Sequence, residues 1–582
     1  MRQKLIATGL ALFAPFAVFA QEAADAVQPE TTISLNSKAA GTPVEAQDWM
    51  VVAANPLAAQ AGAKILQRGG TAADAMVAVQ ALLGLVEPQS SGLGGGAFLV
   101  WYDRESGALT TLDGRETAPA AVTPRLFQNE NGEPLKFWDA VVGGRSVGVP
   151  GTPALMERAH QKWGNQNWAS LFEDGIALAA GGFDVSERLA GMIARDADRL
   201  VRFGGTSGYF YPAGVPLKEG KRLRNPDYAE TLRDLAQHRT ENFYHGDIAR
   251  DIVRTVQDTA GNPGVLSMSD MAAYEVKERA PVCVTYRAHD VCGMGPPSSG
   301  ALTVGQILGM LDGYDLAALG ADNPQSWRLI GDASRLAFAD RGRYMADSDF
   351  VPMPVKGLLD PEYLSLRGEA LDGGPALGSV SAGMPAFDHA LLWADDESIE
   401  LPSTSHISIV DRYGNALSMT TTIENAFGSR LMVRGFLLNN ELTDFSFRTH
   451  KDGIPIANAV APGKRPRSSM APTIVLKDGK PVMVVGSPGG SRIIGYVTKT
   501  IIAHLDWGMN VQEAVSLGHG VNRFGTFDLE KGSAMEGLAP DLETLGYKVK
   551  VRDLNSGLHA ISLGESLLGG ADPRREGVAL GE

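Results

Sequence analysis

The chain has 582 residues, of which 44% are apolar and 20% charged, and its formal net charge at pH 7 is −15. This composition is typical of a globular protein with a large core. Phosphate binding needs a basic face, so the negative charge argues against a nucleic-acid partner.

The first twenty residues have the pattern of a secretory signal. Residues 1–20 read MRQKLIATGLALFAPFAVFA, with Arg2 and Lys4 ahead of an apolar stretch that ends in small residues. The pattern predicts cleavage before Gln21. The apolar stretch is too short for a spanning helix, no later run reaches about 18 apolar residues, and residue 21 is not cysteine. We therefore expect a periplasmic or secreted protein without a membrane anchor.

Helix signals follow in residues 51–103. Asn55 and the proline after it have the positions that a helix cap and first turn prefer, and a Gly-Gly pair ends that helix. Thr71, with Asp74 three residues later, can cap a second helix that runs to about residue 85. The stretch SSGLGGG then leads into AFLVWYD, which has strand composition.

The rest of the chain changes character once. Residues 152–345 show mostly helical periodicity, and residues 372–403 are rich in Gly, Pro, Ser and acids, which predicts a mobile linker. After it, strands alternate with hairpin turns to about residue 487, before the helical stretch IIGYVTKTIIAHLDWG. Helices first and paired strands later predict a layered α+β protein with one large core.

The two cysteines, Cys283 and Cys292, lie in PVCVTYRAHDVCGM, which reads as a hairpin turning around Arg287 to Asp290. In an oxidising compartment they can form a disulfide. Two reduced, half-buried thiols fit the sequence equally well.

Two motif matches fail on their context. Residues 92–97, GLGGGA, match a dinucleotide-binding pattern but follow a helix and precede a strand, the reverse of the required order. Ser146 in GRSVG matches a nucleophile elbow, yet Val149, Pro150 and Gly151 come before any helix can begin. The ten histidines show no ligand spacing. We expect no metal and no cofactor.

The stretch STSHISIVDRYGNALSMTTTI, residues 403–423, reads as two strands joined by a turn. A turn centred on Tyr413 places Thr404 opposite Thr422, with Cβ atoms about 4.5 to 5.5 Å apart. Such pairs usually make only a cross-strand hydrogen bond. Thr404, however, is the first strand residue after the predicted linker.

A threonine hydroxyl becomes a nucleophile when a base takes its proton, and the residue's own α-amino group can be that base. This amine is free only if the chain is cut between Ser403 and Thr404. Its pKa of about 7.7 to 8.0 would suit general-base catalysis near neutral pH. A mobile, exposed linker that ends at a rigid strand is a plausible place for the cut.

The stretch GSPGGSRII follows a predicted hairpin whose turn is Asp478-Gly479. Ser491 would cap the next helix, and the N–H groups of Gly489 and Gly490 would point out of its start, where negative charge is favoured. They can form an oxyanion hole, or simply a glycine-rich turn.

Seven motifs together resemble the γ-glutamyltransferases, or glutathione hydrolases. In chain order they are SSGLGGGAF, LDGRETAP, TSHISIVDRYGNALSMTTTIENAFG, FLLNNELTDFS, RPRSSMAPTIV, GSPGGSRII and GGADPRREG. The resemblance implies an N-terminal nucleophile hydrolase with an αββα four-layer core, made as a proenzyme that cleaves itself. The implied parts are a signal (1–20), an N-terminal extension (21–49), a large subunit (50–403) and a small subunit (404–582), with one shared core.

The resemblance also implies the site. Thr404 would take the γ-glutamyl group through a γ-glutamyl-enzyme and pass it to water, amino acids or peptides, assisted by Thr422 and by the oxyanion hole. Glutathione and other γ-glutamyl compounds would be the substrates. The implied ligands of the substrate's α-carboxylate and α-ammonium are Arg115, Ser468 and Ser469 for the first, and Glu441, Asp444 and Glu424 for the second.

Two segments depart from the family pattern. Residues 448–464, RTHKDGIPIANAVAPGK, contain no Tyr or Trp and look shorter than the aromatic lid of some members, which predicts an open pocket. Residues 516–525, SLGHGVNRFG, do not match the family's usual Pro-Arg stretch.

Two other functions fit parts of the sequence. A cephalosporin or glutaryl acylase of the same fold would act on an acid without the α-amino group, which leaves Glu441 and Asp444 without a cation at high cost. An exported binding protein would stay one uncut chain and need no nucleophile.

Overall fold

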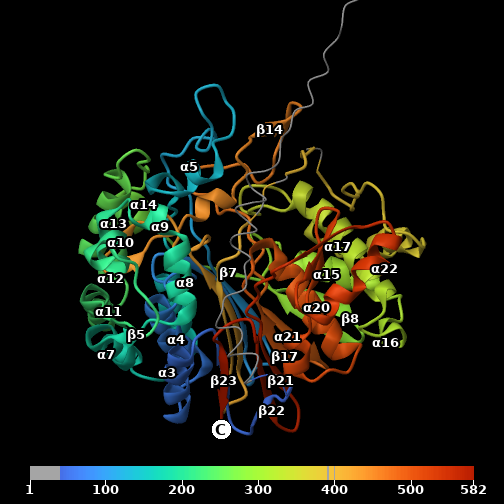
Figure 1. The fold of residues 1–582 in the computed structure, drawn as a ribbon, viewed down its shortest axis with the longest axis horizontal. Coiled ribbons are helices and arrows are strands. Elements are labelled where there is room, and N and C mark those ends of the chain that lie inside the picture. Colours follow the sequence, from blue (N-terminus) through green and yellow to red (C-terminus); the bar gives the residue numbers. More distant parts are fainter. Residues whose placement is uncertain (1–37, 39, 390–391, 397, 399) are drawn as a thin grey trace, which may run out of the picture.

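The computed structural model describes residues 38, 40–389, 392–396, 398 and 400–582. Two seven-stranded antiparallel sheets stack face to face, and helices cover both outer faces (Figure 1). This is the αββα sandwich that the resemblance implies. The predicted signal at residues 1–20 lies outside the described residues.

The first sheet has the order β23-β2-β10-β11-β3-β4-β7. Its strands are β23 (Val578–Gly581), β2 (Met50–Ala53), β10 (Ser405–Val410), β11 (Ala416–Thr422), β3 (Gly96–Tyr102), β4 (Leu109–Gly114) and β7 (Lys277–Arg279). The second sheet has the order β1-β22-β21-β17-β16-β9-β8. Its strands are β1 (Val44–Ala46), β22 (Leu567–Ala571), β21 (His559–Leu563), β17 (Lys480–Gly486), β16 (Thr473–Lys477), β9 (His289–Gly293) and β8 (Val282–Tyr286).

Both sheets mix strands from before and after the Ser403–Thr404 bond. In the first sheet β10 and β11 lie between β2 and β3, and in the second β16, β17, β21 and β22 lie between β1 and β9. Apolar side chains from both sides of the bond, including Val52, Val100, Ile474 and Ile561, fill the space between the sheets. The two parts of the chain therefore share one core.

Two groups of helices cover the sheets. The first sheet carries α3 (Pro56–Gln67), α4 (Ala72–Val86) and α6 (Thr152–Trp163), and the second carries α15 (Gly300–Leu311), α17 (Pro324–Tyr344), α20 (Ile493–Leu505) and α21 (Val511–Ser516). The remaining α-helices are α5 (Phe137–Val141), α7 (Glu173–Gly181), α8 (Glu187–Arg195), α9 (Ala197–Leu200), α10 (Gly204–Phe210), α11 (Pro226–His238), α12 (Glu241–Tyr244), α13 (Asp247–Gln257), α14 (Met268–Ala272), α16 (Leu316–Leu319), α18 (Val355–Leu358), α19 (Pro361–Gly368) and α22 (Ala539–Thr544). No helix in the described part of the chain is long and apolar enough to cross a lipid bilayer.

Four small sheets complete the described part of the fold. They consist of β5 (Phe183–Asp184) with β6 (Arg222–Leu223), β12 (Met432–Val433) with β13 (Phe436–Leu437), β14 (His450–Lys451) with β15 (Ile454–Pro455), and β18 (Gly520–Asn522) with β19 (Thr526–Glu530) and β20 (Lys548–Arg552). The unusual stretch at residues 516–525 thus holds β18.

The structure confirms the sequence signals at the starts of α3 and α4 and at the turn of the β16–β17 hairpin. The Asn55 side chain accepts a hydrogen bond from the N–H of Leu57 at 3.0 Å, and Thr71 forms a capping box with Asp74. The hairpin β16–β17 turns at Asp478-Gly479, both at positive φ. In each case a side chain or a left-handed residue satisfies the geometry that the pattern predicts.

The Cys283–Cys292 pair is a disulfide in the structure. The two cysteines face each other across β8 and β9, with Cα atoms 4.1 Å apart. The hairpin turns at Arg287 and Ala288, which both have positive φ. Of the two alternatives that the sequence leaves open, the structure contains the disulfide.

The N-terminal extension is partly built into the fold. Its residues 44–46 form β1, the edge strand of the second sheet, which pairs with β22. Lys38 donates from Nζ to the carbonyl oxygens of Asp572 (2.8 Å), Arg575 (3.2 Å) and Gly577 (2.5 Å). These contacts attach the extension to the C-terminal segment.

The expectation of an exposed linker is wrong at its last residues. Glu400, Leu401, Ser403 and Thr404 are buried, with 2 to 6% of their surface exposed. Ion pairs hold the segment against the core, because Arg343 pairs with Asp395, Arg467 with Asp396 and Arg341 with Glu400. The bond between Ser403 and Thr404 therefore lies inside the protein.

The GLGGGA turn, residues 92–97, leads from α4 into β3 and brings two backbone segments close together. A Cβ atom on Gly95 would lie 2.0 Å from the carbonyl oxygen of Thr422, and one on Gly94 would lie 2.1 Å from that of Leu437. Neither backbone oxygen can move away easily. Only glycine fits at these two positions.

We predict that Gly95→Ala lowers the free energy of unfolding by about 1 to 3 kcal/mol, because the added methyl overpacks the β3–β11 contact. Gly181→Ala is the matched control. Gly181 ends α7 and its added Cβ would meet no atom within 4 Å. Thermal unfolding of both variants measures the effect, and equal Tm values would contradict the close-approach argument.

Candidate active site

Thr404 and Thr422 meet at the open ends of β10 and β11. The β10–β11 register pairs Ser405 with Thr421 and His406 with Thr420, which confirms the predicted alignment. The Oγ1 atoms of Thr404 and Thr422 lie 3.2 Å apart. The predicted pair is thus brought together in the centre of the first sheet.

Both hydroxyls converge on the carbonyl group of Ser403. Thr404 Oγ1 donates to this carbonyl oxygen, and so does Thr422 Oγ1 at 2.8 Å. Thr422 Oγ1 in turn accepts the N–H of Glu424 at 2.9 Å. The hydroxyl of Thr404 is therefore next to the peptide bond that precedes it, and a second hydroxyl donates to the same carbonyl.

A small cavity surrounds the two threonines. It measures about 20 Å³, which is room for about one water molecule. Glu400, Leu401 and Ser403 form part of its wall. The sequence predicted an open pocket here because residues 448–464 lack an aromatic lid. In the uncut chain the residues just before Thr404 occupy part of this space, and the absence of a lid stays a prediction for the cut enzyme.

Arg115 lies at the end of β4 and pairs with both predicted ammonium ligands. Its guanidinium donates to Asp444 Oδ2 at 2.5 Å and also to Glu441 Oε1, and all three side chains are buried. The carbonyl oxygens of Pro466 and Arg467 accept further bonds at 3.2 and 3.0 Å. The sequence assigned the cation and the two acids to opposite ends of a substrate, whereas here they bind each other.

Acidic side chains outnumber basic ones around Arg115, Glu441 and Asp444. Glu116, which the sequence did not single out, is buried, and burial raises its pKa to about 8. Burial also raises the pKa of Glu441 and Asp444 well above the usual range, against the effect of Arg115, and nearby carboxylates such as Glu400 add to the shift. The cluster therefore favours binding either protons or another cation.

Glu424 also contacts the residues just before Thr404. Its carboxylate accepts the N–H of Leu401 at 3.3 Å and a hydrogen bond from the Asn440 amide. Burial raises its pKa to about 7. Its backbone has φ of 73°, a region that few residues other than glycine adopt. This backbone turn keeps the Glu424 carboxylate at the cavity wall, two residues after Thr422.

The two serines do not share one environment. Ser468 lines the small cavity, and its Oγ accepts the N–H of Met470 at 3.1 Å. Ser469 Oγ accepts a hydrogen bond from Arg341 at 2.8 Å. Arg341 also pairs with Glu400, so this arginine links Ser469 to the residues just before Thr404.

Gly489 and Gly490 both have positive φ, at 142° and 57°. Gly490 lines the cavity, and a Cβ atom there would lie 2.5 Å from the carbonyl oxygen of Glu400. The cap prediction for Ser491 is wrong. Ser491 lies inside a short 3₁₀ turn, Gly490–Arg492, that precedes α20, and its hydroxyl accepts a bond from Arg523.

Arg575 is a site residue that sequence reasoning missed. It is buried, and its Nη1 donates to the carbonyl oxygen of Thr404 at 2.9 Å. Thr404 lies just before Ser405, the first residue of β10, so the hydrogen bonds of the sheet do not hold it. The hydrogen bond from Arg575 holds Thr404 instead. The motif GGADPRREG contains Arg575, but no spacing in the sequence connects it to Thr404.

Ser146 takes no part in the site. Its buried hydroxyl donates to the carbonyl oxygens of Val141 at 2.7 Å and Gly143 at 3.2 Å, so it stabilises its own turn. The context argument against a nucleophile elbow agrees with this structure.

Two antiparallel sheets stack face to face with helices outside them, and the Thr404 hydroxyl lies beside the Ser403–Thr404 peptide bond, just before β10. This arrangement defines an N-terminal nucleophile hydrolase. Comparison with known proteins agrees on the family. The γ-glutamyltranspeptidase family model matches residues 58–582, so the chain belongs to that family of enzymes.

Three similar proteins illustrate the range of the match. The glutathione hydrolase proenzyme of Bacillus subtilis is 37% identical over 92% of both chains. A crystal structure of cephalosporin acylase from Bacillus halodurans has a TM-score of 0.82 at 26% identity, covering 93% of this chain and 97% of that one. The γ-glutamyltranspeptidase of Helicobacter pylori has a TM-score of 0.55 at 32% identity, covering 57% of this chain and 94% of that one.

We predict that Glu424 makes the uncut chain less stable as the pH rises from about 4.5 to about 7. In this window the unfolded chain releases the Glu424 proton and the folded chain keeps it, so stability falls by up to about 1.4 kcal/mol per pH unit. Glu424→Gln should therefore gain stability relative to its parent over the same window.

The measurement compares Tm values from pH 4.5 to 7.5 in a Thr404→Ala background, which removes the hydroxyl that faces the Ser403 carbonyl. Glu219→Gln, a change at an exposed acid, is the control and should leave the pH profile unchanged. A Glu424→Gln profile parallel to that of the parent would contradict the prediction.

Proposed function

We propose that Thr404 is the nucleophile of a γ-glutamyltransferase and glutathione hydrolase, and that the chain frees it by cleaving its own Ser403–Thr404 bond. The observation that carries the proposal is the convergence of the Thr404 and Thr422 hydroxyls on the Ser403 carbonyl. The bond is buried, which argues for cleavage from within, since proteases reach exposed segments.

In the cleavage step, Thr404 Oγ1 adds to the carbonyl carbon of Ser403, and the amide bond to the Thr404 nitrogen breaks. The product is an ester between Ser403 and the Thr404 side chain, with a free α-amine on Thr404. Water then hydrolyses the ester, leaving the Ser403 carboxylate and the Thr404 hydroxyl. The small subunit formed in this way has 179 residues, 404–582.

In each turnover the α-amine of Thr404, with a pKa of about 7.7 to 8.0 when free, takes the hydroxyl proton as Oγ1 attacks the γ-carbonyl. The backbone N–H groups of Gly489 and Gly490 would stabilise the resulting oxyanion, each donor being worth about 10² to 10³ in rate. The leaving amine takes the proton, and the γ-glutamyl-enzyme passes its acyl group to water or to an amino-acid or peptide acceptor.

The charge arrangement supports a zwitterionic glutamyl end. Arg115 and Ser468, with Ser469, would bind the α-carboxylate, and Glu441, Asp444 and Glu424 the α-ammonium. Arg115 would exchange its two carboxylate partners for the substrate carboxylate, while the ammonium replaces it beside the acids. A planar guanidinium suits this exchange, because it binds carboxylates in a bidentate way.

The acylase alternative is favoured by the likeness to the cephalosporin acylase structure and by relatives named acylase ACY 1 proenzyme, which are 32% and 33% identical over 92% of this chain. The buried acids argue against it. A glutaryl or related side chain lacks the α-amino group, so the acids Glu441 and Asp444 would lose Arg115 to the substrate and gain no cation in return. The same argument makes the α-amino group the feature that selects substrates.

The proposal includes export. It is supported by the signal pattern of residues 1–20 and by the Cys283–Cys292 disulfide, which suits an oxidising compartment. A periplasmic or secreted enzyme of this kind would act on glutathione and other γ-glutamyl compounds outside the cytoplasm.

We expect the purified protein to run as two fragments on denaturing electrophoresis, with a new N-terminus at Thr404. Thr404→Ala should abolish both cleavage and turnover, and Thr404→Ser should keep part of each, because serine retains the hydroxyl. Thr421→Ala is the matched control, since Thr421 is buried on the same strand and its hydroxyl has no hydrogen-bond partner among the described residues. Unchanged cleavage in Thr404→Ala, or an uncut wild type, would contradict the proposal.

We expect a γ-glutamyl anilide to be hydrolysed at least about a hundredfold faster, in kcat/KM, than the glutaryl anilide, because unpaired buried groups reject an analogue that lacks their partner. Asp444→Asn should reduce the ratio of the two kcat/KM values, because it should lower kcat/KM for the γ-glutamyl anilide more than for the glutaryl anilide. Asp184→Asn, at an exposed acid paired with Arg222, serves as the control. Faster hydrolysis of the glutaryl compound would favour the acylase alternative.

A further inference from the structure

The turn that follows α4, residues 87–90, contacts the chain on both sides of the proposed nucleophile. The Ser403 hydroxyl donates to the carbonyl oxygen of Gln89 at 2.6 Å. The Ser405 hydroxyl donates to the carboxylate of Glu87 at 2.8 Å. All four residues are buried. The residues before and after the proposed nucleophile are thus anchored to one short segment, which we call the α4 turn.

The α4 turn also holds the end of the strand that carries Thr422. The N–H of Ile423, the next residue, donates to the carbonyl oxygen of Ser90 at 3.3 Å. The N–H of Phe427 donates to the carbonyl oxygen of Gln89 at 3.1 Å. A single segment therefore fixes the backbone near both hydroxyls that meet at the proposed cleavage site.

The α4 turn is itself well supported. Glu87 caps the C-terminus of α4, and its N–H donates to the carbonyl oxygen of Leu83 at 2.8 Å. The second carboxylate oxygen of Glu87 accepts a hydrogen bond from Arg188, on α8, at 3.2 Å. The N–H of Ser90 closes the turn by donating to the Glu87 carbonyl oxygen at 2.9 Å. An anchor can define a reactive geometry only when its own support is rigid, and these contacts supply that support.

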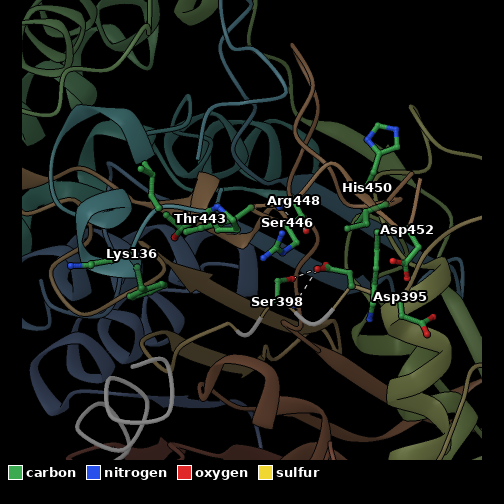
Figure 2. A pocket seen from close by; sticks show the side chains of 15 residues that line it. Lys136, Asp395, Ser398, Thr443, Ser446, Arg448, His450 and Asp452 are labelled. Carbon is green, nitrogen blue, oxygen red and sulfur yellow. Dashed lines mark hydrogen bonds between the residues drawn. The ribbon is translucent and has the colours of Figure 1, made fainter. Parts of the chain in front are cut away.

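The residues further upstream have anchors of their own. The Ser398 hydroxyl donates to Asp396 at 2.7 Å (Figure 2), and the Leu401 N–H donates to Glu424 at 3.3 Å. These contacts hold the segment as a whole. The hydrogen bond from the Ser403 hydroxyl acts closer to the reaction, because Ser403 carries the carbonyl group that would be attacked.

Self-cleavage depends on the direction of this carbonyl group. Attack needs the Thr404 hydroxyl oxygen about 3 to 3.5 Å from the carbonyl carbon of Ser403, with the carbonyl turned toward it. Rotation about the backbone bonds of Ser403 would swing the carbonyl away from the hydroxyl. An anchored side chain on each side, at Ser403 and at Ser405, restricts that rotation. The anchors therefore hold the peptide bond near the geometry of attack.

We propose that the α4 turn is a template for self-cleavage, with Ser403 and Ser405 as positioning residues. The inference rests on the proposed cleavage of the Ser403–Thr404 bond. The two anchors act at different times. Ser403 becomes the last residue of the large subunit, so its anchor serves cleavage alone. Ser405 stays next to Thr404, so its anchor serves both cleavage and every later turnover.

The first measurement follows cleavage of the full chain, made by cell-free translation, as the 179-residue fragment appears on denaturing gels. Ser403→Ala should slow cleavage about three- to tenfold, because it removes one hydrogen bond at the reacting group. Ser403→Thr should keep most of the rate, since it retains the hydroxyl. The Gln89 carbonyl still accepts the N–H of Phe427 in both variants, so neither leaves it unpaired.

The second measurement assays the fully cleaved enzymes with γ-glutamyl 4-nitroanilide. Ser403→Ala should have the kcat and KM of the wild type. Ser405→Ala should slow cleavage and also lower kcat about three- to tenfold with KM unchanged, because it disturbs the nucleophile and leaves the proposed ligands of the glutamyl group in place.

Ser326→Ala is the matched control. Ser326 is buried in the first turn of α17, and its hydroxyl donates to the carbonyl oxygen of Gly320 at 2.6 Å, the same length as the Ser403 bond. In a Thr404→Ala background, which stays uncut, Ser326→Ala and Ser403→Ala should lower Tm by similar amounts. Ser326→Ala should nevertheless leave the cleavage rate of the otherwise native chain unchanged.

Three results would overturn the template. They are equal cleavage rates in Ser403→Ala and Ser326→Ala, a lower kcat in fully cleaved Ser403→Ala, and an unchanged kcat in Ser405→Ala. A wild type that stays uncut, or that cannot hydrolyse the anilide, would instead overturn the proposed function itself.

Discussion

The register between β10 and β11 is the constraint on which the site depends. Because side chains alternate along a strand, a slip of one residue would turn Thr404 and Thr422 to opposite faces. The pairing runs from Ser405 with Thr421 to Val410 with Ala416, and the Asp411 side chain closes the turn by accepting the N–H groups of Tyr413 and Asn415. The central position of this hairpin, between β2 and β3, then fixes both threonines in the core.

If the chain is cut as proposed, the same position would keep the two fragments together. Each sheet contains strands from both sides of the Ser403–Thr404 bond, so separation would expose the apolar layer between the sheets. The new terminus is also held locally. Arg575 donates to the Thr404 carbonyl, and Lys38 donates to the carbonyl of Arg575, so two segments far apart in sequence support Thr404, the proposed new terminus.

Local signals made much of the fold predictable. The caps at Asn55 and Thr71, the β10–β11 register and the Asp478-Gly479 turn depend on residues close in sequence, and all were predicted correctly. The family motifs also selected the residues that gather at the site. The burial of residues 400–403 could not be read in this way, because it arises from Arg341 and Arg467, which lie far away in sequence. Composition alone suggested a linker there. Arg575 was missed for the same reason.

The proposed cleavage and the proposed substrate binding would be coupled, because they use one space. In the uncut chain Leu401 donates its N–H to Glu424, and Glu400 binds Arg341, which also holds Ser469. Residues 400 and 401 thus place an N–H donor at the acid Glu424 and a carboxylate at the cation Arg341. A glutamyl zwitterion likewise carries a donor group, its ammonium, and a carboxylate. Arg115 meanwhile pairs with both Glu441 and Asp444. The charges needed for the substrate therefore have partners before any substrate can enter. This keeps a strongly charged pocket stable inside the core until the chain is cut.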